Sequence, residues 1–392
     1  MSDWKEYKLG DICTILGRIG FRGYTKDDFV QRPEDGAIAL SPSNIIDGVI
    51  DTAKVAYISW EKYKESPEIM LQIGDVVLSK TGTIGRTAIV RDLPHPITLN
   101  PQLVVLKNIK INNYFLSYLL KTPYFQGLLY SITVGSVVST LSQKNLSNLM
   151  IMAPGKEEQE RIVFILKTLD DKIECNRRIN KNLEQQAQAL FKSWFVDFEP
   201  FKDQPFVESE LGMIPHGWRA GKLGELCQFK RGKGLLSKDA IPGDVPVVAG
   251  GLEPSCYHNV SNTKSPVVTV SGSGANAGFM RMYYQEVWAS DCSFIDSTCE
   301  NLFFVYCFLA INRRLLKHAQ TGAVQPHVKP ADIHEFDLTI PPKDVIDRFQ
   351  NIVSETFLMR GNIANESRRL AELRDTLLPR LMSGELKVND VI

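Results

Sequence analysis

The sequence has no hydrophobic run long enough to cross a lipid bilayer. Its longest strongly apolar stretch, Leu302–Ile311, has about half of the ~20 residues that a transmembrane helix requires. The N-terminal residues also lack the basic and apolar segments of a secretory signal peptide. We therefore expect a soluble, cytoplasmic protein that does not bind a membrane.

Metal-binding and cofactor-binding motifs are missing as well. The seven cysteines form no Cys-x-x-Cys pair, and His318, His327 and His334 lack the spacing of a zinc site. We find no P-loop, no dinucleotide-binding glycine motif and no nuclease metal motif in a suitable context. The stretch Asn100–Leu103 lacks the second proline and the aromatic residue of an amino-methyltransferase motif. These absences argue against a self-contained enzyme, and we expect free thiols and no cofactor.

The chain has no excess of charge of either sign. Lysine plus arginine and aspartate plus glutamate both number 45 in 392 residues. A DNA-binding protein that acts alone usually carries a basic surplus. Any DNA binding by this chain must therefore depend on local patches and on partner subunits.

A long internal repeat is the most informative feature that the sequence does contain. The phrase Trp-x3-Lys-Leu-Gly begins at Trp4 and again at Trp218, 214 residues later, whereas Pro154 recurs as Pro341 at an offset of 187. The first copy is longer by the difference between these offsets, 27 residues, and the additional length precedes Tyr114. A period of this size is typical of two whole domains and is far too long for a solenoid unit.

Each copy has a mixed α and β pattern. Short strand-like segments and turns are followed by one predicted helix, Tyr114–Leu129 in the first copy and Leu302–Ala319 in the second. A polar loop and a last strand then lead to the repeated proline. Since no βαβα alternation is present, we predict an α+β fold made of two similar domains.

After each repeated proline the pattern changes to a long helix with apolar residues seven apart, which is typical of a coiled coil. About 40 residues at 1.5 Å each give a rod of about 60 Å. Two amphipathic helices packed on their own domains are the alternative. Polar residues interrupt the helices at different levels, and Asn176 corresponds to Ile363. We therefore predict an antiparallel pair whose register these residues help to set. The repeated positions are Ile162, Leu169, Asn176, Leu183 and Leu190 in one helix and Phe349, Thr356, Ile363, Leu370 and Leu377 in the other.

These patterns divide the chain into five parts. We predict domains at residues 1–155 and 218–342, and long helices at 156–199 and 343–392, the latter with a C-terminal tail. Residues 200–217 are predicted to be a linker because proline and glycine punctuate them.

Over its full length, the chain resembles the specificity subunit of Type I restriction–modification systems, the HsdS family. The resemblance rests on the repeated Trp-x3-Lys-Leu-Gly phrase, the segment Ser209–Trp218, the helix phrase Asn182–Phe195 and the tail Leu377–Leu386. It implies two target-recognition domains and a non-catalytic DNA reader. It also implies partners on separate chains, namely two adenine methyltransferase subunits and ATP-driven endonuclease subunits.

Two different readers on a rigid spacer should recognise two different half-sites of double-stranded DNA, separated by unread base pairs. Because the copies differ, the site should be asymmetric. The exposed faces of the long helices are the expected docking surface for the methyltransferase. A coiled-coil scaffold whose domains bind protein, without DNA specificity, is the alternative function.

Two glycine-rich loops, Ser79–Arg86 and Ser271–Gly278, are the first candidates for DNA contact. Their hydroxyls, amides and cations suit phosphates and base edges. A plain tight hairpin is the alternative, and a nucleotide-phosphate site is disfavoured because the second loop opens no helix. The candidate residues are Lys80, Thr81, Thr83, Arg86, Ser273 and Asn276.

The polar loops after the two domain helices are the second candidates, because the same kind of loop recurs at the same place in both copies. A structural turn is the alternative. The candidate residues are Ser136, Gln143, Lys144, Gln325, His327 and Lys329. A third group, Arg18, Arg22, Arg231 and Lys233, is predicted to contact phosphates, with ordinary surface charge as the alternative.

Overall fold

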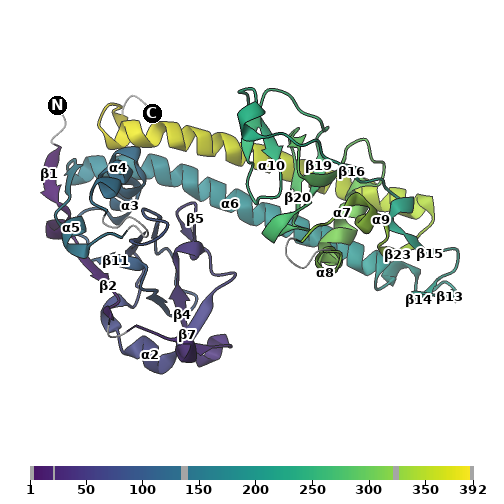
Figure 1. Cartoon of the computed structure of the whole chain (residues 1–392), viewed down its shortest axis with the longest axis horizontal. Coiled ribbons are helices and arrows are strands. Elements are labelled where there is room, and N and C mark those ends of the chain that lie inside the picture. Colours follow the sequence, from purple (N-terminus) through teal and green to yellow (C-terminus); the bar gives the residue numbers. More distant parts are fainter. Residues whose placement is uncertain (1–3, 21–22, 134–139, 321–325, 389–392) are drawn as a thin grey trace. The chain divides into compact units, whose positions relative to one another are not determined.

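The computed structural model of the chain (Figure 1) describes residues 4–20, 23–133, 140–320 and 326–388. The chain divides into two compact units. Unit 1 comprises Met1–Ile173 and Leu370–Ile392, and unit 2 comprises Glu174–Arg369. Each unit contains one copy of the repeat and one section of each long helix.

Unit 1 is built on two sheets of four strands. The first has the antiparallel order β2-β11-β8-β9, and the second has the order β10-β4-β7-β3 with β10 parallel to β4. Its strands are β1 (Lys5–Lys8), β2 (Thr14–Gly17), β3 (Phe29–Val30), β4 (Gly36–Leu40), β5 (Ile45–Ile46), β6 (Val49–Ile50), β7 (Ala56–Ser59), β8 (Val76–Ser79), β9 (Thr87–Ile89), β10 (Ile97–Leu99), β11 (Leu103–Lys107) and β12 (Met150–Ala153). Its short helices are α1 (Leu9–Ile12), α2 (Trp60–Lys64), α3 (Asn113–Lys121), α4 (Pro123–Ser131) and α5 (Gln143–Ser147).

Unit 2 repeats this plan with fewer elements. Its antiparallel sheet has the order β16-β22-β19-β20, and a second sheet has the order β18-β17-β21 with β21 parallel to β17. The strands are β13 (Phe206–Ser209), β14 (Gly212–Pro215), β15 (Arg219–Lys222), β16 (Lys230–Arg231), β17 (Val245–Val248), β18 (Cys256–His258), β19 (Val267–Ser271), β20 (Met280–Tyr283), β21 (Trp288–Ala289), β22 (Cys292–Asp296) and β23 (Asp337–Ile340). The short helices are α7 (Leu302–Ile311), α8 (Arg313–His318) and α9 (Pro330–His334).

Equivalent strands pair in the same way in the two units. β1 pairs with β12 in unit 1 as β15 pairs with β23 in unit 2, and each of these strand pairs brings the start of a domain next to its last strand. Unit 1 additionally has β3, β5, β6 and α2, all of which lie in the region where the sequence places the 27 additional residues. The expected α+β fold with an internal repeat is confirmed.

The helix expected in each domain is not continuous, so that detail of the prediction is wrong. In unit 1, α3 ends before Thr122 and α4 begins at Pro123, because proline has no N–H with which to continue the helix. The Thr122 hydroxyl caps the new helix by accepting a hydrogen bond from the N–H of Phe125 at 3.2 Å. In unit 2 the interruption lies at Asn312, between α7 and α8, without a proline.

The two long helices are α6 (Lys156–Phe195) and α10 (Lys343–Met382). Within unit 2 they run antiparallel, since Asn176, Glu184 and Phe191 of α6 contact Glu366, Arg360 and Phe349 of α10 in that order. The polar residue Asn176 is buried and donates a hydrogen bond to Glu366 at 2.7 Å. A buried amide that pairs with a residue of the other helix opposes a shift of the helices along each other.

Each unit also holds its helix pair with an acid on α6 and an arginine on α10. In unit 1, Asp170 accepts hydrogen bonds from Arg374 at 2.9 Å and from the hydroxyl of Tyr118 on α3 at 2.8 Å. The pairing in unit 2 has the same form, with Glu184 accepting from Arg360 at 2.8 Å and from Tyr306 on α7 at 2.6 Å. The tyrosine therefore connects each domain to α6, and the same acid connects α6 to α10.

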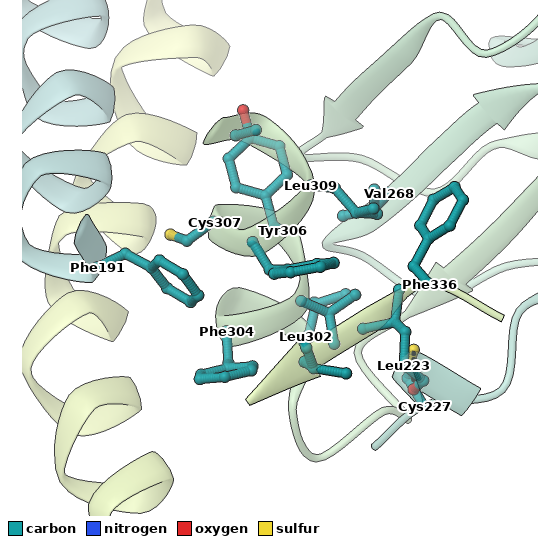
Figure 2. Close-up of a cluster of buried hydrophobic side chains, with 14 of the residues drawn as sticks. Phe191, Leu223, Cys227, Val268, Leu302, Phe304, Tyr306, Cys307, Leu309 and Phe336 are labelled. Atoms are coloured by element: carbon teal, nitrogen blue, oxygen red, sulfur yellow. Dashed lines mark hydrogen bonds between the residues drawn. The ribbon is translucent and has the colours of Figure 1, made fainter. Parts of the chain in front are cut away.

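The core of unit 2 is continuous with its helix pair (Figure 2). Phe191 projects from α6 towards Phe304 of α7, and their ring centroids are 5.0 Å apart. Phe349 of α10 lies 5.6 Å from the same Phe191 ring. Domain and helices consequently share one hydrophobic core, and burial of these rings favours their joint folding.

The segment predicted to be a linker contains a β-hairpin, because β13 and β14 pair in antiparallel fashion from Phe206 to Pro215. Before the hairpin, Phe198 and Phe201 pack on Trp218 with centroid distances of 5.4 and 5.0 Å. The connection is therefore an ordered part of unit 2. Among the described residues, no helix is both long and apolar enough to span a membrane.

Candidate functional site

The glycine-rich loop of unit 1 connects β8 to β9 and is closed by its own backbone. The N–H of Gly85 donates to the carbonyl of Ser79 at 3.1 Å, and Gly85 has a φ of +90°, which a residue with a side chain rarely adopts. The Ser79 hydroxyl accepts a hydrogen bond from the N–H of Arg86 at 2.9 Å and donates to the carbonyl of Thr83. This closure leaves Thr83 and Arg86 exposed at the loop surface.

The second candidate loop of unit 1 lies directly beside the first. Thr81 pairs with Thr140 as an antiparallel bridge, and the N–H of Leu141 donates to the carbonyl of Lys80 at 2.8 Å. Lys80 is partly buried, which lowers the pKa of its ammonium group. Gln143 and Lys144 follow at the start of α5, so the two loops present their polar residues close together in the chain's fold.

Unit 2 brings its two loops together in the same way. The N–H of Gly278 closes the loop by donating to the carbonyl of Ser271 at 2.9 Å, with φ at +78°. Ser273 pairs with His327, and the N–H of Val328 donates to the carbonyl of Gly272 at 3.1 Å. Sequence offsets alone did not place these loops next to each other.

The remaining predicted contacts fall into different environments. Asn276 donates its amide to the carbonyl of Gly250 at 3.3 Å, and the side chain of Lys329 is exposed at the start of α9. Arg86 is exposed and also donates to the carbonyl of Pro42 at 3.2 Å. Lys233 is exposed. Three predicted residues, Arg22, Ser136 and Gln325, lie outside the described residues.

Arg18 is buried, which is unfavourable for the predicted phosphate contact. Only 5% of its surface is exposed, and its guanidinium donates to the carbonyl of Leu99 and to the hydroxyl of Thr98, both at 3.1 Å. Burial lowers the pKa of this guanidinium, and the ring of Tyr24 lies 5.2 Å away. Arg18 therefore belongs to the interior of unit 1 and is not among the DNA contacts proposed below.

Arg231 has a different environment from Arg18. It is about half exposed and forms an ion pair with Asp291, the residue immediately before β22. Asp291 also accepts a hydrogen bond from the hydroxyl of Ser273. Arg231, one candidate of the third group, therefore meets the glycine-rich loop in unit 2.

Sequence reasoning missed Asp291 and its counterpart in unit 1. The register pairs Leu103 with Ser79 in unit 1 and Cys292 with Ser271 in unit 2, so Gln102 occupies the position of Asp291. Gln102 is exposed, and its amide lies near Gly82 of the loop. A search for polar residues just before the third repeated strand of each copy could have found both.

The chemistry of these loops is that of hydroxyls, amides and cations, which suits nucleic-acid phosphates and base edges. Among the described residues, no group of three His, Cys, Asp or Glu side chains is placed to hold a metal ion. Each of the seven cysteines is a free thiol. Burial raises the pKa of the thiol of Cys13 to about 12.

Comparison with known proteins identifies the family. A family profile described as the Type I restriction modification DNA specificity domain matches residues 1–185 and 215–373, one match in each copy of the repeat. The Type I restriction enzyme MjaIX specificity subunit of Methanocaldococcus jannaschii is 27% identical over 100% of this chain and 95% of its own length. The HindI specificity subunit of Haemophilus influenzae is 25% identical over 98% of this chain and 100% of its own length.

A solved structure agrees at the level of the fold. The S subunit of a Type I restriction–modification system from M. genitalium superimposes with a TM-score of 0.57, covering 97% of this chain and 96% of that one at 17% identity. The family match covers both copies of the repeat and most of the chain. This chain therefore belongs to the family of Type I restriction–modification DNA specificity subunits.

Proposed function

We propose that this specificity subunit reads an asymmetric, two-part site in double-stranded DNA. It is non-catalytic, and it directs adenine N6 methylation and restriction that partner subunits carry out. Residues 1–155 and 218–342 act as the two recognition domains, residues 156–199 and 343–392 as the spacer helices and tail, and residues 200–217 as the connection. Unit 1 reads one half-site and unit 2 reads the other.

The main support for this proposal is a backbone bridge between two loops that both units share. In both units the same two loops are joined by a backbone bridge, Thr81 with Thr140 and Ser273 with His327, while the side chains on them differ. A shared backbone with different polar side chains is what two readers of different sequences require. Side-chain contacts to base edges specify sequence, whereas phosphate contacts position the protein.

The proposed contacts divide by chemistry. Glutamine, asparagine and histidine suit base edges, and hydroxyls and cations suit phosphates. In unit 1 we propose Lys80, Thr81, Thr83, Arg86, Gln143 and Lys144, together with Gln102, which is exposed near Gly82 of the loop. In unit 2 we propose Arg231, Lys233, Ser273, Asn276, His327 and Lys329.

The proposed partners are two methyltransferase subunits, with endonuclease subunits joining through the complex. Apolar side chains stand exposed on the long helices, including Phe164 at 68% on α6 and Leu358 at 65% and Met359 at 52% on α10. Exposed apolar side chains of this size on a helix favour protein docking. With equal numbers of basic and acidic residues, the chain also depends on partners for part of the phosphate contact.

The first test is to co-express the chain with its cognate methyltransferase subunit and to map N6-methyladenine in the host DNA by single-molecule sequencing. The expected result is one asymmetric, gapped motif that is absent when the methyltransferase is expressed alone. The double substitution His327→Ala with Lys329→Ala should alter only one half of that motif. Gln143→Ala with Lys144→Ala should alter only the other half.

If the subunits are folded and bound and no gapped motif appears, the reader function is wrong and a protein-binding scaffold takes its place. Docking is tested separately by copurification. Leu358→Ser with Met359→Ser should release the methyltransferase, whereas Ile73→Ser, at a 69% exposed position outside the long helices, should not.

A further inference from the structure

Arg231 and Asp291 form an ion pair on the surface of unit 2 that lies directly over Gly272. The Nη2 group of Arg231 donates to Oδ1 of Asp291. A Cβ atom added at Gly272 would come within 2.3 Å of Nη1 of Arg231 and 3.1 Å of Oδ1 of Asp291. The guanidinium therefore occupies the space that any side chain at position 272 would need.

Asp291 is itself held by the glycine-rich loop. Its Oδ2 accepts a hydrogen bond from the Ser273 hydroxyl, and its backbone carbonyl accepts one from the N–H of Gly272 at 3.0 Å. The carbonyl of Gly272 in turn accepts from the N–H of Val328 at 3.1 Å. The carboxylate is thus fixed by neighbours on both sides, and it fixes the guanidinium.

This arrangement differs from an ordinary surface ion pair. An exposed pair with two free side chains has little preferred geometry and contributes little. Here the acid engages one edge of the guanidinium, and Arg231 remains 46% exposed. A planar guanidinium held at one edge is prepared to donate two hydrogen bonds to O6 and N7 of guanine, the commonest specific protein–DNA contact.

Unit 1 has a glycine at the position of Arg231, and its loop carries Lys80 at the position of Gly272. Gly17 pairs with Val104 as Arg231 pairs with Ser293, so Gly17 stands in the position of Arg231. The amide of Gln143 lies over Gly17, 2.6 Å from where a Cβ would be. With Gln102 in the position of Asp291, unit 1 presents amides beside the partly buried Lys80 and has no counterpart of the Arg231–Asp291 pair at these described positions.

We propose that Arg231, positioned by Asp291 on Gly272, reads a guanine in the half-site bound by unit 2. This rests on the proposed function and deepens it, since it makes Arg231 a base reader in place of a phosphate contact. Asp291 acts through Arg231 and is a positioning residue. A base reader and a phosphate contact respond differently to substitution by lysine, because lysine keeps the charge and loses the two-pronged geometry.

The experiment uses the purified complex of the full chain with its cognate methyltransferase subunit. Initial methylation rates are measured on DNA duplexes that carry each base in turn at each position of the motif. The variants are Arg231→Lys, Asp291→Asn and Gly272→Ala, the last of which leaves both charged groups in place. Arg231→Ala is measured beside these three to detect a phosphate contact. Gly234→Ala is the matched control, because an added Cβ there meets nothing within 4 Å.

We expect Arg231→Lys and Gly272→Ala to reduce the preference for guanine at one position by about 10- to 100-fold, with the other half-site unchanged. Asp291→Asn should reduce it by a smaller factor at the same position, and Gly234→Ala should match the wild type. If the wild-type complex has a motif and all three variants read it unchanged, the guanine contact is wrong and the proposed function is unaffected. Retention by Arg231→Lys together with a uniform loss in Arg231→Ala over all bases also overturns it, since that result describes a phosphate contact. A wild-type complex with no sequence-dependent methylation contradicts the proposed function itself.

Discussion

The two units share a backbone plan and differ in the side chains that the plan displays. In both units a glycine with positive φ closes the glycine-rich loop, Gly85 after β8 and Gly278 after β19. A backbone bridge joins that loop to the polar segment that follows the short helices of the domain. At the shared positions, unit 1 has Gly17 and Gln102 where unit 2 has Arg231 and Asp291. Because equivalent backbone bonds close the loops in both units, the side chains at these two positions differ without a change of fold.

In the long helices, by contrast, equivalent positions of the two copies carry chemically different residues. At the offset of 187 residues, Glu184 corresponds to Ala371 and Arg360 corresponds to Ile173. The acids therefore lie on α6 and the arginines on α10 in both units. The contacts within each unit favour pairing of α6 with α10 over pairing of either helix with its own kind.

The largest expected effect is a loss of stability in unit 2 that leaves unit 1 unchanged. Phe191→Ala should lower the free energy of unfolding of unit 2 by about 3–5 kcal/mol, since it opens a cavity among Phe195, Phe304 and Phe349. Hydrogen exchange should show faster exchange of unit 2 amides. Phe164→Ala, at a side chain 68% exposed, is the control and should change stability by less than about 0.5 kcal/mol. Equal loss of protection in unit 1 would contradict the division into two units.

The ion pair between the helices gives the next largest effect. Glu184→Gln should lower the free energy of unfolding by about 3 kcal/mol, because Arg360 is only 10% exposed and would keep an uncompensated charge. The double variant Glu184→Gln with Arg360→Met should recover most of this loss in urea unfolding. Glu300→Gln is the control, since the pair of Glu300 with Lys343 is exposed, and it should change stability by about 0–1 kcal/mol. A double variant no more stable than Glu184→Gln would show that the pair does not account for the effect.

Replacing Gly127 in α4 should stabilise the protein and tests whether the two units are equivalent at this helix position. Gly127 lies inside α4, an added Cβ there meets nothing within 4 Å, and unit 2 has Arg314 at the equivalent position of α8. Gly127→Ala should therefore raise the free energy of unfolding by about 0.5–1 kcal/mol, measured by urea unfolding. Gly278→Ala should have the opposite sign, because Gly278 has a φ of +78° and its Cβ would lie 2.7 Å from the carbonyl oxygen of Leu316. Destabilisation by Gly127→Ala would mean that the two helix positions are not equivalent.

The smallest expected effect depends on pH and involves α6 alone. Hydrogen bonds from Arg177 and Arg178 lower the pKa of the Glu174 carboxyl from 4.5 to about 2, and the equivalent residue of α10 is Gly361. A lowered pKa in the folded state stabilises the protein above pH 4.5, and this contribution is lost as the pH falls towards 2. Since solvent screens the group, Glu174→Gln should cost only a few tenths of a kcal/mol at pH 7. The difference between the urea midpoints of variant and wild type should shrink at pH 3, and a constant difference would rule out the titration.

The sequence was sufficient for the features that depend on periodicity and repetition. The prolines at 154 and 341 and the seven-residue apolar repeat predicted both long helices to within a few residues of α6 and α10. The break at Thr122 and Pro123 was visible in the sequence and was missed, because the apolar pattern continues through it. Asn176 was expected to help set the register, and it is buried against Glu366.

Contacts that depend on strand register could not be predicted. Asp291 reaches the loop after β19 only because β22 pairs with β19 in one register, and no local pattern encodes that distance. Arg18 resembles a surface cation in sequence, and its burial follows from packing beside β10 and the segment at Ser66. The long-range meeting of Thr81 with Thr140 is of the same kind.

We propose that each unit reads its own half of one site. The most direct test of this proposal maps N6-methyladenine in cells that express the methyltransferase with the wild-type chain, with Gln102→Ala or with Arg231→Ala. We expect one gapped motif whose first half alone changes in one variant and whose second half alone changes in the other. Changes by both variants in the same half, or by either variant in both halves, would contradict the proposal.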